Sequence, residues 1–189
     1  IKIAVDMVKE KLISKKDALL RINPNSLENL LHPSIDEKSE INVLANGLPA
    51  SPGAASGKVV FTSEDAERLN SMMQDTILVR VETSPEDING MHAAKGILTS
   101  RGGMTSHAAV VARGMGRPCV SGSSELEIDY KNKTFKVKNH AVKEGDTITI
   151  DGSTGRIILG KVETVKPDIS GDFLELMNWA DDFRKLKIR

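Results

Sequence analysis

The sequence predicts an α/β fold for the central part of this chain. Between residues 58 and 121, β-like segments alternate with segments that carry helix signals, as in a layered α/β domain. From residue 134 to residue 159 the pattern is β alone, with the turn DGSTG inside it. Glycines and prolines separate the segments, as they do where strands and helices end. The 189 residues leave room for one domain of roughly 100–150 residues with appended segments.

The first 46 residues predict short helices followed by a linker. Four apolar side chains are spaced to share one helix face: Ile3, Val5, Val8 and Leu12. Ser14–Asp17 resembles a capping box that opens a second helix, which Asn23-Pro24 would end. Ser26 would cap a third helix over Leu27–Leu31, and the polar stretch HPSIDEKSE follows. We expect these helices to form the edge of a neighbouring domain.

The central elements are predicted from local patterns. Strands are expected over seven segments: Lys58–Thr62, Thr76–Val81, Gly96–Thr99, Pro118–Ser121, Thr134–Val137, Thr147–Ile150 and Arg156–Leu159. Thr62 caps a helix that runs to Met72, and Ser84 with a proline at the first helical position opens another that runs to about Ala94. A third, apolar helix runs from His107 to about Met115. A linker and an amphipathic helix near Asp172–Leu186 end the chain.

Composition narrows the class of function. Lys+Arg and Asp+Glu balance at 26 each, so charge gives no reason to expect nucleic acid or a membrane as a partner. The single cysteine, Cys119, excludes an internal disulfide and favours a cytoplasmic setting. The sequence contains no apolar run of 18 residues, and its first residues lack both an initiator Met and the apolar block of a signal peptide. We therefore expect the chain to be part of a longer cytoplasmic protein.

The chemistry is expected in the stretch TSRGGMTSHAAVVARGMGRPCVSG, residues 99–122. His107 follows the capping-type pair Thr105-Ser106, so it falls in the first turn of a helix. The free N–H groups and partial positive charge of a helix N-terminus favour an anion such as a phosphoryl group. Gly102 and Gly103 allow a bulky donor to approach the backbone, and the two hydroxyls can cap the helix or bond the phosphate. A lone histidine at a helix start is usually a surface residue. This interpretation therefore depends on the whole stretch of residues 99–122 and not on His107 alone.

Other residues of reactive type have plainer explanations. Arg101 and Arg113 flank the motif and are candidates to pair with phosphate, against a role as surface charge. Cys119 lies in an apolar strand and is expected in the core. The remaining histidines are scattered, so no metal site is predicted: His32, His92 and His140. Gly53–Val59 lacks the spacing and the Ser/Thr of a P-loop and is expected to be a turn that feeds a strand.

Three stretches together resemble one enzyme family. Gly102–Gly114 is similar to the phosphohistidine motif of the enzymes that interconvert pyruvate and phosphoenolpyruvate (PEP), the PEP-utilising enzymes. Gly47–Gly57 resembles the entrance of that family's domain and Glu144–Gly152 its closing hairpin, so the resemblance covers about residues 45–160. Met104 and the flanking sequences resemble the dikinase branch, because PEP synthase and enzyme I of the sugar phosphotransferase system usually have Arg at the position of Met104.

The resemblance implies a swivelling β/β/α phosphohistidine domain over residues 47–162. Residues 1–46 would be a helical linker or the edge of a nucleotide-binding domain, and residues 163–189 a linker and helix leading to a PEP/pyruvate-binding domain. His107 would carry the phosphoryl group on its tele nitrogen, Nε2. The supporting residues would be Gly102, Gly103, Thr105, Ser106 and Arg113. Thr105 also matches a threonine that a regulatory protein phosphorylates in some dikinases.

The same resemblance implies an activity for the longer protein. A phosphotransferase with paired acceptors would convert ATP, phosphate and pyruvate reversibly into AMP, diphosphate and PEP, with Mg²⁺ bound by the neighbouring domains and not by this chain. The chain alone would be only a phosphoacceptor and a monomer, and the full-length enzyme a homodimer. Two alternatives stay open: the phosphohistidine domain of PEP synthase or enzyme I, and a non-catalytic module in which His107 is only a cap.

Overall fold

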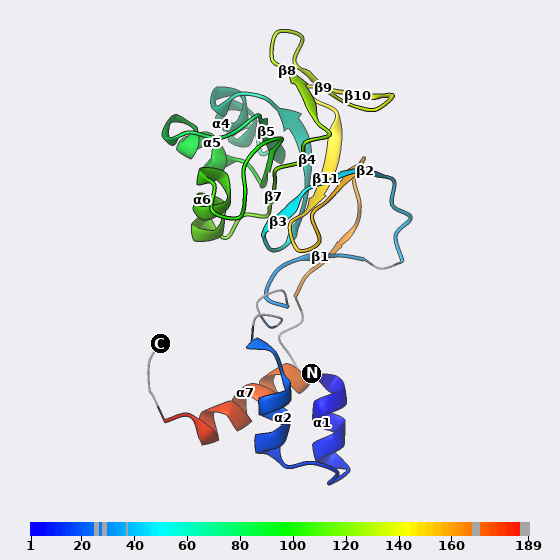
Figure 1. Ribbon diagram of the computed structural model, residues 1–189, viewed down its shortest axis with the longest axis vertical. Coiled ribbons are helices and arrows are strands. Elements are labelled where there is room, and N and C mark those ends of the chain that lie inside the picture. The colour runs from blue at the N-terminus through cyan, green and yellow to red at the C-terminus, as the bar shows by residue number, and fades with distance from the viewer. Residues whose placement is uncertain (25–26, 28–29, 37, 168–170, 186–189) are drawn as a thin grey trace. The chain divides into compact units, whose positions relative to one another are not determined.

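A computed structural model describes residues 1–24, 27, 30–36, 38–167 and 171–185 of the chain. The chain divides into two compact units (Figure 1). One contains residues 32–166, and the other contains residues 1–31 together with residues 167–189.

The unit of residues 32–166 is built on one mixed sheet of eight strands. Their order in the sheet is β2 (Val43–Asn46), β12 (Arg156–Leu159), β11 (Thr147–Asp151), β4 (Ala54–Val60), β5 (Thr76–Arg80), β6 (Gly96–Thr99), β7 (Cys119–Ser121) and β3 (Leu48–Ser51). Strands β4 to β7 are parallel, and the other neighbouring pairs are antiparallel. Parallel neighbours need crossover connections, and helices provide them here: α4 (Ser63–Ser71), η1 with α5 (Pro85–Asp87 and Ile88–Ala93) and α6 (His107–Met115).

Two hydrophobic cores lie on opposite faces of this sheet. Neighbouring residues of a strand point to opposite faces, and accordingly Val59 and Phe61 belong to one core while Val60 belongs to the other. The core that contains Val60 packs against the three helices, and includes Met91, Ala108, Ala109 and Ala112. The opposite core includes residues of a second, three-stranded sheet, β10 (His140–Lys143), β9 (Thr134–Val137) and β8 (Glu127–Asp129) (Figure 1). The α/β class is confirmed, with layers of small sheet, large sheet and helices.

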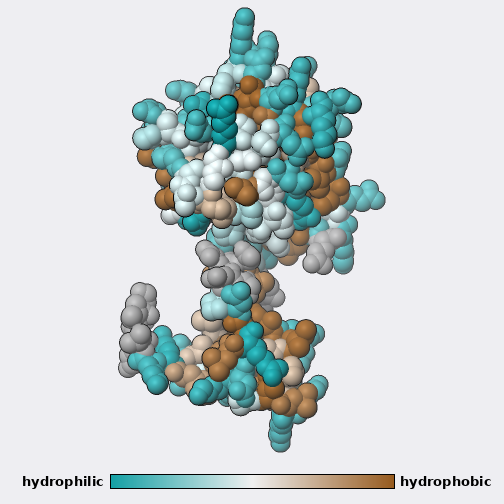
Figure 2. Space-filling model, viewed as in Figure 1, coloured by the Kyte–Doolittle hydropathy of each residue, from teal (hydrophilic) through white to brown (hydrophobic). Residues whose placement is uncertain are grey.

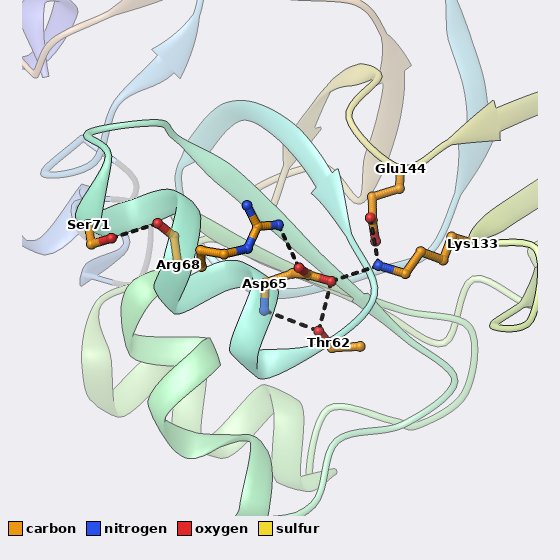
Figure 3. Close-up of polar contacts among 6 residues, drawn as sticks. All are labelled: Thr62, Asp65, Arg68, Ser71, Lys133 and Glu144. Atoms are coloured by element: carbon orange, nitrogen blue, oxygen red, sulfur yellow. Dashed lines mark hydrogen bonds and ion pairs between the residues drawn. The ribbon is translucent and has the colours of Figure 1, made fainter.

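A network of charges ties the small sheet to helix α4 (Figure 3). The carboxylate of Asp65, in the first turn of α4, accepts hydrogen bonds from Arg68 Nη2 at 2.7 Å and from Lys133 Nζ at 2.9 Å. Lys133 immediately precedes β9, and its ammonium also donates to Glu144 Oε1 at 2.7 Å. Thr62 caps the helix, as predicted, by accepting a hydrogen bond from the Asp65 N–H at 3.1 Å.

Two strands of the small sheet were not predicted from the sequence. Strands β8 and β10 expose most of their side chains, so neither shows a clear apolar alternation. Only Val142 of β10 is buried, and no residue of β8 is fully buried. The hairpin of β9 and β10 therefore lies in a stretch for which the sequence predicts only a solvated surface.

In the described part of the second unit, three helices drawn from both ends of the chain pack together. Helices α1 (Lys2–Lys9), α2 (Lys15–Arg21) and α7 (Asp172–Phe183) share a small core: Val5, Ala18, Leu176 and Trp179. Ser14 caps α2 as predicted, since its hydroxyl accepts a hydrogen bond from the Asp17 N–H at 3.1 Å. The two flanking segments therefore fold together, which their separation along the sequence did not indicate.

Part of the predicted apolar face of α1 is not buried within this unit. Ile3 is 77% exposed and Leu12 is 64% exposed, because α1 ends at Lys9 and only its Val5 side faces the core. Figure 2 shows hydrophobic residues, in brown, at the surface of the helical unit, where Leu20 and Leu174 are also exposed. Two further predictions fall partly on residues outside those described. They are the third helix over Leu27–Leu31 with its cap Ser26, and the end of the last helix at Leu186.

The sheet unit is longer than the predicted domain of residues 47–162. Strand β2 pairs with β12, and β1 (Ser34–Ile35) pairs antiparallel with β13 (Thr164–Val165), so residues 32–46 and 163–166 belong to this unit and not to the helical flanks. The predicted boundaries missed these strands because two-residue and four-residue segments carry little pattern of their own. Among the described residues, no helix has both the length and the apolar character needed to span a membrane.

Candidate functional site

His107 is the first residue of helix α6, as the sequence predicted. Ser106 is its N-cap, and the Ser106 hydroxyl accepts a hydrogen bond from the Ala109 N–H at 3.4 Å. The helix ends at Gly116, which takes the left-handed conformation with φ 63°. His107 itself is partly exposed. The histidine therefore lies at the positive end of a helix that packs on the sheet through Ala108, Ala109 and Ala112.

The imidazole is held through one of its two nitrogens. Thr83 Oγ1 lies 2.9 Å from His107 Nδ1, and the Thr83 side chain is buried, with 8% of the residue exposed. A hydroxyl oxygen that accepts the Nδ1 proton leaves the lone pair on Nε2. Because Thr83 occupies Nδ1, Nε2 is the ring nitrogen left open, and its use as the phosphoryl acceptor stays a prediction.

Thr83 was not singled out from the sequence. It lies in the loop between β5 and η1, at the carboxyl end of the parallel strands, where α/β sheets commonly place functional groups. That position was the available signal, but Thr83 and His107 are 24 positions apart, and no sequence pattern pairs them.

The loop that carries Thr83 is held at both ends. Before it, the Val81 N–H donates to the Tyr130 hydroxyl at 2.7 Å, and Arg80 Nη1 donates to the Phe61 carbonyl at 3.1 Å. After it, Asp87 accepts a hydrogen bond from the Ser84 N–H at 3.0 Å, and its other oxygen accepts one from the Ser63 hydroxyl at 2.9 Å. Tyr130 directly follows strand β8 of the small sheet and Ser63 begins helix α4, so elements on both sides of the large sheet help to position Thr83.

The carboxylate of Glu86 adds negative charge near the ring. A hydrogen bond from Ser84 is the main cause that lowers the pKa of Glu86 below its ordinary value, and the charge of His107 acts in the same direction to a smaller degree. Glu86 therefore stays ionised at the exposed side of the site.

The two glycines before the motif differ in their surroundings. Gly102 has φ 111°, and a Cβ added to it would lie 2.9 Å from both Cβ and Oγ of Ser106. Gly103 has nothing within 4 Å of an added Cβ. The fold itself therefore requires glycine at Gly102, whereas room for a donor at Gly103 stays a prediction.

Arg113 holds the loop in front of the histidine. Its Nε donates to the Ala50 carbonyl at 3.0 Å, and its Nη2 donates to the Met104 carbonyl at 2.8 Å. These contacts make Arg113 a brace between β3 and the residues before His107, a role that the sequence did not predict. The side chains of Arg101 and Thr105 are exposed, and a contact of Arg101 or Arg113 with phosphate, like phosphorylation of Thr105, stays a prediction.

Cys119 is confirmed as a core residue. It is fully buried in β7, and burial raises the pKa of its thiol to about 12. Such a thiol is a poor nucleophile at neutral pH, because the thiolate is the reactive form. Gly53–Val59 was expected to be a turn that feeds a strand, but Ala54–Val59 already belong to strand β4 and only Gly53 precedes it. No group of three or more His, Cys, Asp and Glu side chains that could hold a metal ion occurs in the described part of the chain.

Comparisons with known proteins found one matching family model and a set of similar curated proteins. Residues 72–155 match the family model of the PEP-utilising enzyme mobile domain. The whole chain is 54% identical to pyruvate, phosphate dikinase of Rhizobium meliloti (strain 1021) and 57% identical to that of Rickettsia bellii (strain RML369-C), and each match covers 21% of the relative. Pyruvate, phosphate dikinase 2 of Zea mays is 53% identical over the whole chain, which covers 22% of that protein.

The chain thus spans about a fifth of the length of the curated relatives it matches. The solved structure of Thermococcus kodakaraensis aconitase X aligns with 62% of this chain and with 98% of its own chain. Its TM-score of 0.38 and identity of 16% are too low to indicate fold or function.

Proposed function

We propose that this chain, whose residues 72–155 match the mobile domain of the PEP-utilising enzymes, is the phosphohistidine part of a pyruvate, phosphate dikinase. The contact between His107 Nδ1 and Thr83 Oγ1 carries the proposal, because it orients the ring and leaves Nε2 for chemistry. The start of helix α6 supports it, since the free N–H groups there favour a phosphoryl group on the first residue.

The proposed chemistry moves phosphoryl groups on and off Nε2. With PEP, the Nε2 lone pair attacks phosphorus, the bond from phosphorus to the enol oxygen breaks, and the enolate takes a proton to become pyruvate. With ATP, Nε2 takes a pyrophosphoryl group and AMP leaves; inorganic phosphate then accepts the outer phosphoryl group and leaves as diphosphate. In this scheme Nδ1 keeps its proton and donates it in the hydrogen bond to Thr83 Oγ1 throughout. Positioning of the ring is the chain's own contribution, as is general in phosphoryl transfer.

Mg²⁺ belongs to the proposal only through other parts of the polypeptide. A magnesium ion would offset the charge of the phosphates. The described residues of this chain offer no cluster of ligands for it, so we assign its binding to the neighbouring domains.

The position of the tethers supports a swivelling carrier. The Ala54 N–H, at the start of β4, donates to the Pro33 carbonyl at 2.8 Å, and β1 and β13 pair with each other. The chain thus enters and leaves the sheet unit near the amino end of β4, whereas His107 follows the carboxyl end of β6. A strand of seven residues, the length of β4, separates these edges by roughly 20 Å. Rotation about the paired tethers would therefore sweep His107 between two distant sites.

The remaining parts of the proposal concern the longer protein. Because the chain spans about a fifth of its relatives, the nucleotide-binding and PEP/pyruvate-binding domains would lie in the same polypeptide and supply ATP, phosphate and pyruvate. The whole protein would be a cytoplasmic phosphotransferase with paired acceptors and a homodimer. The present chain would be a monomeric phosphoacceptor without turnover of its own.

Transfer of labelled phosphate tests this function. The chain is incubated with Mg²⁺, radiolabelled PEP and the PEP-binding part of the parent enzyme. We expect acid-labile, alkali-stable label on His107, no label in His107→Ala, and full labelling in the matched surface variant His140→Ala. Label that persists in His107→Ala would refute the proposal. A requirement for inorganic phosphate and release of diphosphate by the intact parent separates a dikinase from PEP synthase and enzyme I.

A further inference from the structure

Three hydroxyl groups, those of Ser106, Ser121 and Thr99, form a hydrogen-bonded line that starts at the cap of helix α6. Ser106 Oγ lies 3.3 Å from Ser121 Oγ, and Ser121 Oγ lies 3.1 Å from Thr99 Oγ1. Thr99 ends β6 and Ser121 ends β7, and both residues have no exposed surface. The line thus connects the ends of two core strands to the residue directly before His107.

The direction of these hydrogen bonds follows from counting protons. Thr99 Oγ1 donates its only proton to the Arg101 carbonyl at 2.7 Å, because a carbonyl can only accept. Ser121 must then donate to Thr99, and Ser106 must donate to Ser121. The Ser106 oxygen also accepts the Ala109 N–H. The Ser106 hydroxyl therefore points its proton into the core and has none to give to a phosphoryl group on His107.

Gly102 closes this line from outside. A Cβ added to Gly102 would lie 2.9 Å from Ser106 Oγ and 3.0 Å from Ser121 Oγ, so the backbone of Gly102 already packs on both hydroxyls. Hydrogen bonds that run in one direction strengthen one another.

We propose that Ser121 and Thr99 are positioning residues for His107, which act by holding the Ser106 hydroxyl in place as the cap of α6. This inference rests on the proposed function, since it assigns these residues a part in phosphoryl transfer to His107. It also separates the two hydroxyls of the motif: Ser106 serves the helix, whereas Thr105 is exposed.

Substitutions along the line test the inference in the full-length parent enzyme. Thr99→Val and Ser121→Ala remove one hydroxyl each, and we expect the rate of His107 phosphorylation by saturating PEP to fall about 2- to 10-fold, as for one lost hydrogen bond. In the 189-residue chain, hydrogen exchange of the Ala109 amide should become faster by a similar factor. Thr99→Ser keeps the hydroxyl and should restore both values.

Ser123→Ala is the matched control. Ser123 is equally buried, and its hydroxyl donates to the Asn46 carbonyl at 2.9 Å without contact to Ser106. This variant should lose stability but keep the wild-type transfer rate and Ala109 exchange. If Ser121→Ala lowers the rate, the combined variant Ser106→Ala/Ser121→Ala should be no slower than Ser106→Ala alone, because both act through the same cap.

Two results would overturn the inference. One is an unchanged rate and unchanged Ala109 exchange in Thr99→Val and Ser121→Ala; the other is an equal loss of rate in Ser123→Ala, which would indicate general destabilisation. Should Ser121→Ala fail to fold, the pair Thr99→Val and Thr99→Ser decides alone. If wild-type His107 accepts no phosphate, the proposed function fails, whereas Ala109 exchange still decides whether the hydroxyl line holds the cap.

Discussion

Replacing Asp65 with Asn should destabilise the sheet unit at neutral pH but not in acid. The Asp65 carboxylate is the centre of the network in Figure 3, and its side chain is only 16% exposed. Hydrogen bonds from Arg68 and then Lys133 lower the pKa of Asp65 from 3.8 to about 2, against the opposing effect of burial.

The size of the effect follows from this pKa. A tenfold change in proton affinity corresponds to about 1.4 kcal/mol, so the lowered pKa of Asp65 corresponds to about 2 kcal/mol of folding free energy. Because the folded-state pKa lies below the unfolded one, this contribution is fully present above pH 3.8 and is lost as the pH falls toward about 2. Asn, like a protonated carboxyl, cannot make the ionic part of these contacts.

Urea denaturation followed by far-UV circular dichroism measures the difference. At pH 7 the free energy of unfolding of Asp65→Asn should be about 2 kcal/mol below wild type, and at pH 2 the two should nearly coincide. Glu64→Gln is the matched control, because it removes an exposed acid from the same helical turn without touching Lys133. The fluorescence of Trp179, in the helical unit, should not report the change.

Two outcomes would refute this reasoning. An equal loss of stability in Glu64→Gln at pH 7 would mean that only charge at the helix N-terminus matters. A deficit of Asp65→Asn that persists at pH 2 would mean that packing, and not the ionised carboxylate, stabilises this contact.

Three further predictions concern the site and the sheet. Thr83→Val should slow labelling of His107 by PEP about 2- to 10-fold, with recovery in Thr83→Ser, because one hydrogen bond to the ring is lost. Cys119 should resist alkylation by iodoacetamide in the folded chain and react after addition of urea, since burial raises its pKa to about 12; mass spectrometry follows the adduct. Gly152→Ala should cost more than about 4 kcal/mol in urea denaturation, because the new Cβ would collide with a backbone carbonyl of β3. Gly114→Ala, in open space on α6, should be neutral or stabilising.

Helix starts were the most predictable features of this chain. Ser14, Thr62 and Ser106 each cap the helix expected of them, because a cap is a contact between residues three apart. The fourth start, at Ser84, begins as a 3-10 turn and then continues as α5. His107 was found for the same reason, as the first residue after such a cap in a motif typical of one family.

The partners of the site were much less predictable. Thr83 and Tyr130 lie in loops that precede η1 and follow β8, and the contacts of Arg113 with the carbonyls of Ala50 and Met104 were not predicted from its place in the motif. The pairing of α1 and α2 with α7, and of β1 with β13, joins segments more than a hundred residues apart.

By itself the sequence determined the α/β class, the helix starts, the burial of Cys119 and the place of His107 in the first turn of its helix, since each depends on patterns within a few neighbouring residues. Only the tertiary structure decided which nitrogen of His107 is held, where the proton of Ser106 points, and how the two flanks of the chain combine. These depend on which strands become neighbours in the sheet. Strand order brings residues together across loops, and hydrogen bonds between such residues leave no periodic trace in the sequence.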